Sequence, residues 1–173
     1  GRLKIKFTDQ LLDEVIAESL RHISRKHEDY QIDVECEEFI LVHMDVRLII
    51  QVLVNLIDNA IKYTLPGSKI CIRGIKKDGQ AQISVADNGP GISDEAKLHL
   101  FDMFYTADIG KADSRRGLGL GLSLCKSIVD AHGGEISVSD NKPHGAVFSF
   151  TLSLSYDNRP VHSLHLDILK SEL

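Results

Sequence analysis

Apolar side chains recur along the chain at two spacings, which predict a mixture of strands and helices. Residues 3–7 alternate apolar and polar positions as a short strand does, and Thr8 can then cap a helix whose apolar face continues to Ile23. Phe7 and Leu12 would form a hydrophobic staple at the start of that helix. Two further β runs are expected over the ranges 30–36 and 39–44, separated by acidic turn residues.

The most informative stretch is a helix predicted over residues 46–63, which Asp45 can cap. At roughly 100° per residue, its apolar side chains cover most of the circumference, so this helix must be largely buried. The narrow polar stripe that remains consists of Gln51, Asn55, Asp58, Asn59 and Lys62, with Tyr63 one turn further round. Amides beside a wide apolar face need specific partners, and metal or phosphate oxygens would serve. A solvated stripe without a ligand is the alternative.

A predicted hairpin joins strands over 69–75 and 81–87. Because side chains alternate along a strand, Asp87 ends the second strand on its inward face. An inward carboxylate is costly unless hydrogen-bond donors reach it, and the exocyclic amine of adenine is one such donor. The alternative is a carboxylate that caps its own turn through the N–H groups of Asn88 and Gly89. The glycines of this turn would let backbone and ligand approach closely.

Three alternate glycines with leucines between them, at 117–122, lead directly into the apolar pattern of another helix. Glycine reaches positive φ easily, so backbone N–H groups can turn toward an anion, and the following helix adds the positive end of its dipole. The spacing is not that of the dinucleotide fingerprint, and a tight turn or a close-packed helix entry remains an alternative. Residues 106–116 contain charges but little to bury, which predicts a lid-like loop.

The remaining stretches complete the element pattern. Ser93 or Asp94 can start a short helix, and the aromatic cluster that follows over 98–105 is predicted to be mainly core. The helix that begins near residue 122 should end at a histidine and two glycines. A second hairpin is predicted from strands over 136–139 and 146–154.

Composition indicates one ordinary domain, because the chain has 173 residues of which 43% are hydrophobic. We expect this domain to span residues 1–154 and a tail of unknown role to span 155–173. The tail pair His162 and His165 could ligate a metal by spacing alone, but it lacks nearby acidic or thiol partners. The net charge of −5 argues against nucleic-acid binding.

The three cysteines, Cys36, Cys71 and Cys125, lack the spacing of a zinc site or disulfide framework and are expected to be buried or idle thiols in a reducing compartment. No apolar run is long enough to span a bilayer, and no signal segment opens the chain. The chain opens on Gly1 rather than Met, which indicates an excised fragment.

Five segments, in order along the chain, resemble the N, G1, F, G2 and G3 boxes of sensor histidine kinases. They are 51–64, 87–92, 101–104, 117–122 and Gly145 before an alternating strand. The stretches 52–63 and 127–134 further resemble the KdpD-type potassium sensors. The resemblance covers about residues 3–154. It implies a two-layer α/β sandwich, the Bergerat ATP-binding fold of the GHKL superfamily, with a mixed sheet of about five strands packed on three helices.

The same resemblance implies ATP and Mg²⁺ as ligands and assigns a role to each matching residue. Asn59 would bind Mg²⁺, while Asn55 and Lys62 would lie near the phosphates, so that Asn59 and Lys62 serve the chemistry. Tyr63 would contact adenine, and Asp87 would accept a hydrogen bond from its N6 amine. The remaining nucleotide contacts would come from Gly89, Gly91, Ile92, Gly117, Leu118, Gly119, Leu120, Gly121 and Leu122.

The activity implied is transfer of the γ-phosphoryl group of ATP to a histidine in a separate dimerisation domain. That acceptor segment, which resembles Ser-His-Glu-Leu-Arg-Thr-Pro in the family, does not occur in this sequence; the dipeptide at His27 is followed by Asp29 and breaks the pattern. The fragment should therefore bind ATP without autophosphorylating. The expected partners are the histidine-bearing helices and, through the parent chain, a response regulator.

The fragment itself is expected to contact neither nucleic acid nor membrane and to be a cytoplasmic part of an inner-membrane sensor. Two other functions remain open. One is an ATPase clamp of the topoisomerase, mismatch-repair or chaperone type, although no hydrolytic base is obvious near Asn59. The other is a nucleotide-sensing module without chemistry.

Overall fold

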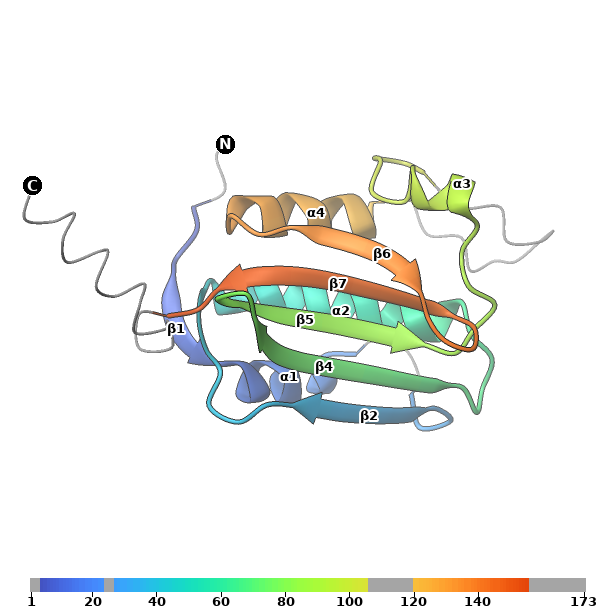
Figure 1. The fold of residues 1–173 in the computed structure, drawn as a ribbon, viewed down its shortest axis with the longest axis horizontal. Coiled ribbons are helices and arrows are strands. Elements are labelled where there is room, and N and C mark those ends of the chain that lie inside the picture. The colour runs from blue at the N-terminus through green and yellow to red at the C-terminus, as the bar shows by residue number, and fades with distance from the viewer. Residues whose placement is uncertain (1–3, 24–26, 106–119, 156–173) are drawn as a thin grey trace, which may run out of the picture.

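The computed structural model describes residues 4–23, 27–105 and 120–155, which form a sheet with helices against one of its faces (Figure 1). In chain order the elements are β1 (Thr8–Leu11), α1 (Leu12–Arg21), β2 (Gln31–Cys36), β3 (Leu41–Met44), α2 (Val46–Lys62), β4 (Lys69–Lys77), β5 (Gln80–Asp87), α3 (Asp94–Lys97), α4 (Gly121–Ala131), β6 (Ile136–Asp140) and β7 (Ala146–Ser153). None of the helices in these described ranges is long and apolar enough to cross a membrane.

The main sheet has five strands in the order β2-β4-β5-β7-β6. Strands β2 and β4 are parallel, and the other neighbours are antiparallel. A second sheet pairs β1 with β3, and a bridge between Val42 and Leu154 joins it to the end of β7. With α1, α2 and α4 on one face of the main sheet (Figure 1), this architecture confirms the predicted two-layer α/β sandwich.

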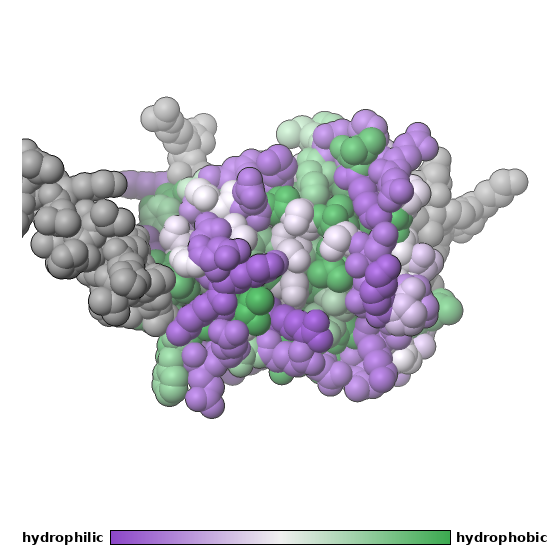
Figure 2. Space-filling view, viewed as in Figure 1, coloured by the Kyte–Doolittle hydropathy of each residue, from purple (hydrophilic) through white to green (hydrophobic). Residues whose placement is uncertain are grey.

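The core lies between the main sheet and α2, which packs against both α1 and α4. The fully buried side chains of α2 are Ile49, Val52, Leu53, Leu56 and Ile57. Burial alternates along β5 and β7, so every second side chain of these strands faces the helices. Figure 2 shows the opposite, open face, where hydrophilic residues cover most of the surface with smaller hydrophobic areas between them. The prediction that α2 is mostly buried is therefore confirmed.

The predicted positions of the first strand and of the start of the first helix are wrong. Residues 4–7 form no strand, and the strand instead occupies β1, where it pairs with β3. The helix begins at Leu12 and has Leu11 before it, so Thr8 is not its cap. Pairing with β3 satisfies the backbone groups of a whole strand, whereas a Thr8 cap would have satisfied a single N–H group.

The predicted staple between Phe7 and Leu12 is also not formed in the expected way, because Phe7 does not directly precede the helix. The ring of Phe7 stacks on His43 with the ring centroids 5.0 Å apart and meets His132 edge-on at 5.2 Å. Phe7 thus joins the N-terminal segment to β3 and to the end of α4.

The other predicted elements are confirmed to within a few residues, including both hairpins. Asp45 caps α2 by accepting from the Arg47 N–H at 3.2 Å, and Ser93 caps α3 by accepting from the Ala96 N–H at 3.1 Å. Helix α4 ends at its predicted histidine, which Gly133 follows at a φ of +74°.

The cluster over 98–105 is only half core. Leu100 is buried and Phe101 meets Phe148 edge-on, with centroids 6.3 Å apart, whereas Met103 and Phe104 are exposed. Two predictions, the loop over 106–116 and the tail from residue 156, lie outside the described residues.

Candidate functional site

Three segments that are distant in the sequence meet at the end of the sheet where β5 finishes (Figure 1). They are the C-terminal half of α2, the turn after β5 and the first turn of α4. A Cβ added at Gly89 would lie 2.7 Å from Thr64 Cγ2, and one added at Gly121 would lie 3.8 Å from Asn55 Oδ1. The turn between β6 and β7 packs against the same turn after β5, because the Ala146 N–H donates to Asp87 Oδ1 at 3.4 Å.

One face of α2 carries Asn55, Asn59 and Lys62 toward this junction, since residues four and seven apart share a helix face. The two asparagines are half-buried. The Asn55 side chain lies against the first turn of α4, and the Cys125 thiol of α4 donates to the Val52 carbonyl of α2 at 3.8 Å. The fold thus places the amide of Asn55 beside the N-terminus of α4.

Lys62 is a buried cation, only 8% exposed at the C-terminal end of α2. Its ammonium lies 5.0 Å from the centroid of the Tyr63 ring, which itself is 39% exposed. A cation over an aromatic face is stabilised electrostatically, but burial of an ammonium favours a nearby negative charge. This position therefore suits an anionic ligand.

Asp87 is 8% exposed at the end of β5. Its Oδ1 atom accepts from the Gly89 N–H at 2.9 Å and from the Ala146 N–H at 3.4 Å. Burial raises the pKa of this carboxyl, although the two hydrogen bonds act in the opposite direction. Within the described ranges both bonds fall on Oδ1, so Oδ2 is the oxygen with capacity left for a ligand donor.

The alternative prediction, that Asp87 caps its own turn, is correct for Gly89 and wrong for Asn88. The Asn88 N–H donates to the Lys69 carbonyl at 3.3 Å instead. Self-capping therefore occupies one carboxylate oxygen, and ligand binding through the other oxygen remains compatible with it.

Two glycines bring backbones into direct contact beside Asp87. Gly145 has a φ of +116°, and a Cβ there would lie 1.9 Å from the Asp87 carbonyl oxygen. Gly91 has a φ of +80°, and a Cβ there would lie 3.4 Å from the Gly145 oxygen. A side chain at Gly145 would push the two turns apart, whereas at Gly91 it is the positive φ that favours glycine. Gly145 thus has a physical role in setting the position of Asp87.

The N-terminus of α4 differs from those of α2 and α3, because the preceding residue, Leu120, has no side-chain oxygen to cap it. The free N–H groups of its first turn can therefore receive an anion. Leu122 packs against the core and holds this turn in place. Three of the predicted phosphate-binding residues, Gly117, Leu118 and Gly119, lie outside the described residues.

Sequence reasoning missed two residues that support the end of α2. The Tyr30 hydroxyl donates to the Ile61 carbonyl at 3.2 Å or to the Thr64 carbonyl at 3.3 Å. The buried Thr64 hydroxyl donates to the Ala60 carbonyl at 2.6 Å. Thr64 follows the polar stripe directly, whereas no local signal points to Tyr30.

It also missed two residues on the turn between β6 and β7. Asn141 Nδ2 donates to the Asp87 carbonyl at 2.8 Å, and His144 Nδ1 lies 3.0 Å from the Gly89 carbonyl. Polar residues are ordinary in a hairpin turn. Only the placement of this hairpin beside β5 brings them to the turn that follows Asp87.

Comparison with known proteins identifies the family. Residues 44–156 match the family described as histidine kinase-, DNA gyrase B-, and HSP90-like ATPase. The chain belongs to this family. It is therefore an ATP-binding domain, and the matched range includes α2, Asp87 and the N-terminus of α4.

Individual relatives narrow the assignment within this ATPase family. The chain is 41% identical over 153 residues to the sensor protein KdpD of Clostridium acetobutylicum, which covers 88% of this chain but 17% of that protein. It also resembles the nucleotide-free catalytic domain of histidine kinase ThkA, with 34% identity and a TM-score of 0.74 over 85% of this chain and 97% of the other. The same kinase in complex with the response regulator protein TrrA matches at 32% identity and a TM-score of 0.74, covering 90% of this chain and 44% of that one.

These matches confirm the predicted resemblance to sensor histidine kinases, KdpD among them. The chain is a histidine kinase ATP-binding catalytic domain. It spans about a sixth of its KdpD relative, so the reaction of a whole kinase is a matter for the proposal that follows.

Proposed function

We propose that this domain binds ATP with Mg²⁺ and presents the γ-phosphoryl group to a histidine on a separate helical domain of its parent chain. The observation that carries the proposal is the arrangement of three groups at one end of the sheet. A buried carboxylate with one oxygen left for a donor, a face of amides and a buried lysine, and an uncapped helix N-terminus lie together there.

Asp87 forms the adenine end of this site. Its Oδ2 accepts a hydrogen bond from the N6 amine, which discriminates adenine from bases that carry an acceptor at that position. Gly89 and Gly91 leave room for the base, Ile92 anchors their turn to the core, and Tyr63 contacts adenine from the end of α2. The burial of Asp87 supports this assignment, because a buried acceptor with capacity left favours a ligand that donates.

The phosphates lie at the other end, between α2 and α4. Lys62 supplies positive charge, Asn55 lies near the phosphates, and Asn59 binds Mg²⁺ through its amide oxygen. Neutral oxygen donors on one helix face fit a Mg²⁺ ion that takes its other ligands from phosphate and water. The bound ion would neutralise charge on the triphosphate. The remaining phosphate contacts come from Gly117, Leu118, Gly119, Leu120, Gly121 and Leu122.

Apolar side chains beside this site support docking of the histidine-bearing helices. Those that are exposed are Leu98, Met103, Phe104, Leu120 and Leu124. The segment after α3 and the N-terminal end of α4, which carry them, lie side by side in Figure 1. An amphipathic helix that covers them would bring its polar face toward the phosphate end.

The wider assignments follow from this reading. We assign residues 1–154 to the catalytic domain and the residues from 155 on to a tail. A response regulator is a partner through the parent chain, in keeping with the ThkA complex. The domain works on the cytoplasmic side of a membrane sensor, where ATP is available.

The test supplies the acceptor helices of the parent chain in trans with Mg²⁺ and ATP labelled at the γ-phosphate. We expect label on the acceptor histidine and a loss of at least 100-fold for Asn59→Ala, whose Mg²⁺ requirement for ATP binding should also disappear. Gln51→Ala is the matched control, because Gln51 is an exposed residue on the same polar stripe and should transfer label normally.

Other outcomes would point to the other functions considered above. Rapid release of labelled inorganic phosphate without label on the helices would indicate a clamp-type ATPase. Nucleotide binding with neither product would indicate a sensing module. An Asn59→Ala variant with an unchanged Mg²⁺ response would show that the metal ligand is elsewhere.

A further inference from the structure

The turn between β6 and β7 binds two carbonyls of the turn that follows β5, those of Asp87 and Gly89. Asn141 Nδ2 donates to the Asp87 carbonyl at 2.8 Å, and His144 Nδ1 lies 3.0 Å from the Gly89 carbonyl. A carbonyl oxygen only accepts, so His144 donates here through Nδ1–H. The two side chains hold the two ends of the turn whose Gly89 N–H also binds Asp87 Oδ1.

Asn141 is fixed in this orientation by its own surroundings. Its Oδ1 accepts from the Lys142 N–H at 2.9 Å, and its backbone N–H donates to the Gly145 carbonyl at 2.9 Å. The amide oxygen is therefore occupied by Lys142, and this fixes the side chain with its Nδ2 atom toward the Asp87 carbonyl. An aspartate at this position has the same shape and keeps the acceptor for Lys142, but it has no donor for the Asp87 carbonyl.

The two turns are in such close contact that a shift of the turn between β6 and β7 would move Asp87. The Asp87 carbonyl leaves no space for a Cβ at Gly145, and the Ala146 N–H donates to the Asp87 carboxylate. Asp87 Oδ1 is thus held from its own turn by Gly89 and from the neighbouring hairpin by Ala146. The location of Oδ2 depends on both turns keeping their relative position.

We propose that Asn141 and His144 are positioning residues that set the base selectivity of this domain by fixing the carboxylate of Asp87. This inference rests on the proposed adenine role of Asp87. The two residues do not touch the base themselves. They hold the acceptor where an amine at the adenine 6-position can donate to it and where the 6-oxygen of guanine is repelled.

The test measures the affinities of ADP, GDP and pyrophosphate for the 173-residue chain by calorimetry with Mg²⁺ present. For Asn141→Asp we expect about a tenfold loss of ADP affinity, with GDP and pyrophosphate changed by less than about twofold. Loss of the ADP preference with pyrophosphate binding retained is a readout that a general loss of stability would not produce. Lys142→Gln, in the same turn and with the same change of one charge, should match the wild type.

His144 provides a second, independent pair of variants, because it is exposed and its replacement should not disturb folding. His144→Asp replaces the donor with acceptors and should weaken ADP by about threefold to tenfold. His144→Asn places an amide donor near the position of Nδ1 and should restore ADP affinity to within about twofold of wild type.

The outcomes separate this inference from the function on which it rests. If the wild-type chain prefers ADP to GDP and the Asn141→Asp and His144→Asp variants keep that preference, the positioning role is wrong while the adenine role of Asp87 stands. A parallel loss of all three ligands would likewise overturn the positioning role. If the wild-type chain and Asp87→Asn both bind ADP and GDP alike, the adenine role itself fails.

Discussion

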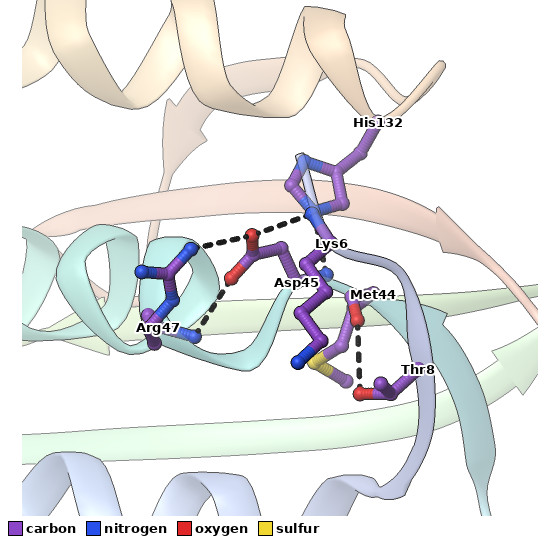
Figure 3. A network of polar contacts seen from close by, with 6 residues as sticks. All are labelled: Lys6, Thr8, Met44, Asp45, Arg47 and His132. Atoms are coloured by element: carbon purple, nitrogen blue, oxygen red, sulfur yellow. Dashed lines mark hydrogen bonds and ion pairs between the residues drawn. The ribbon is translucent and has the colours of Figure 1, made fainter. Parts of the chain in front are cut away.

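Two aspartates of the described residues are buried at opposite ends of α2, and they differ in how fully their oxygens are hydrogen-bonded. Asp45, 1% exposed, accepts from the Lys6 N–H at 2.9 Å, the Arg47 N–H at 3.2 Å and the Arg47 guanidinium at 3.3 Å (Figure 3). Among the described residues, Asp87 accepts only from backbone N–H groups, and on one oxygen. Burial is similar for the two residues, so the use of their hydrogen-bonding capacity is what distinguishes them.

The pKa directions reflect this difference. Burial alone would raise the pKa of Asp45, but the hydrogen bonds from Lys6 and Arg47 outweigh it and the pKa is lowered. At Asp87 burial prevails and the pKa is raised. A buried carboxylate satisfied by its own chain has a structural role, whereas one with an oxygen left for a donor is a candidate for ligand binding.

The N-termini of α2 and α4 differ in the same way, because one has a side-chain cap and the other has none. Asp45 caps α2, and its own N–H donates to His132 Nε2 at 3.0 Å (Figure 3). His132 Nδ1 lies 2.7 Å from the Ile128 carbonyl, to which it donates. These hydrogen bonds join α2 to α4 at the end of the molecule where α2 begins and α4 finishes, which we call the closed end. At the other end α4 begins after Leu120 without a side-chain cap. The closed end uses its polar groups internally, and the site end leaves them available.

The largest effect should come from breaking the closed end. Asp45→Ala removes the cap of α2 and leaves the Lys6 and Arg47 N–H groups without their acceptor, so the free energy of unfolding should fall by about 3 kcal/mol. Urea denaturation measures this change. Asp9→Ala is the control, because its carboxylate is an exposed partner of His43 and should contribute less than about 1 kcal/mol.

Nucleotide affinity should not change in Asp45→Ala under conditions where the chain is folded. A loss of stability below about 1 kcal/mol would show that the Asp45 hydrogen bonds contribute little, and the contrast between the two aspartates would then be wrong.

The next effect should come from Asp87→Asn and should appear in binding rather than in stability. An asparagine has one acceptor oxygen where the carboxylate has two, so the Gly89 N–H and the adenine amine would compete for it. We expect ADP affinity to fall by about 30-fold to 100-fold, or about 2 to 3 kcal/mol, with stability unchanged or slightly higher. Calorimetry with ADP and pyrophosphate checks this, and an equal loss for both ligands would contradict the adenine assignment.

The smallest effect is a pair of opposite pH dependences. The lowered pKa of Asp45 means that its stabilisation is complete above the ordinary pKa of an aspartate, about 4, and is lost as the pH falls through its folded-state pKa. The raised pKa of Asp87 gives its contribution to stability the opposite pH dependence. Its contribution is most favourable below about pH 4 and declines as the pH rises through its folded-state pKa.

The stability of wild type relative to Asp45→Asn should therefore increase with pH, whereas its stability relative to Asp87→Asn should decrease. Denaturant unfolding of the three proteins over an acid to neutral pH series measures both slopes. Two slopes of the same sign would mean that the two aspartates do not differ as described.

Some of the candidate site residues predicted from the sequence are ones that a regular element places. A period of 3.6 puts Asn55, Asn59 and Lys62 on one helix face, and a period of two turns Asp87 inward, so both could be predicted without knowing the neighbours. The residues that were missed act across segments distant in the sequence. Asn141 and His144 acquire their role only because the hairpin of β6 and β7 lies beside the end of β5.

The errors in the fold have the same origin. Thr8 carries a local signal for a helix cap, yet β1 pairs with β3, more than thirty residues away, and the helix starts later. Met103 and Phe104 have the composition of core residues but lie where no described element covers them. Local pattern cannot report which of two competing partners a segment will find.

The sequence by itself determined most of the elements, the buried face of α2, the polar stripe on it and the inward direction of Asp87. These follow from periodicity and burial, which each segment carries within itself. Only the tertiary structure decided which oxygen of Asp87 is occupied and which end of the molecule is closed. The physical reason is that hydrogen-bond satisfaction belongs to pairs of groups, and the partners here come from segments that only folding brings together.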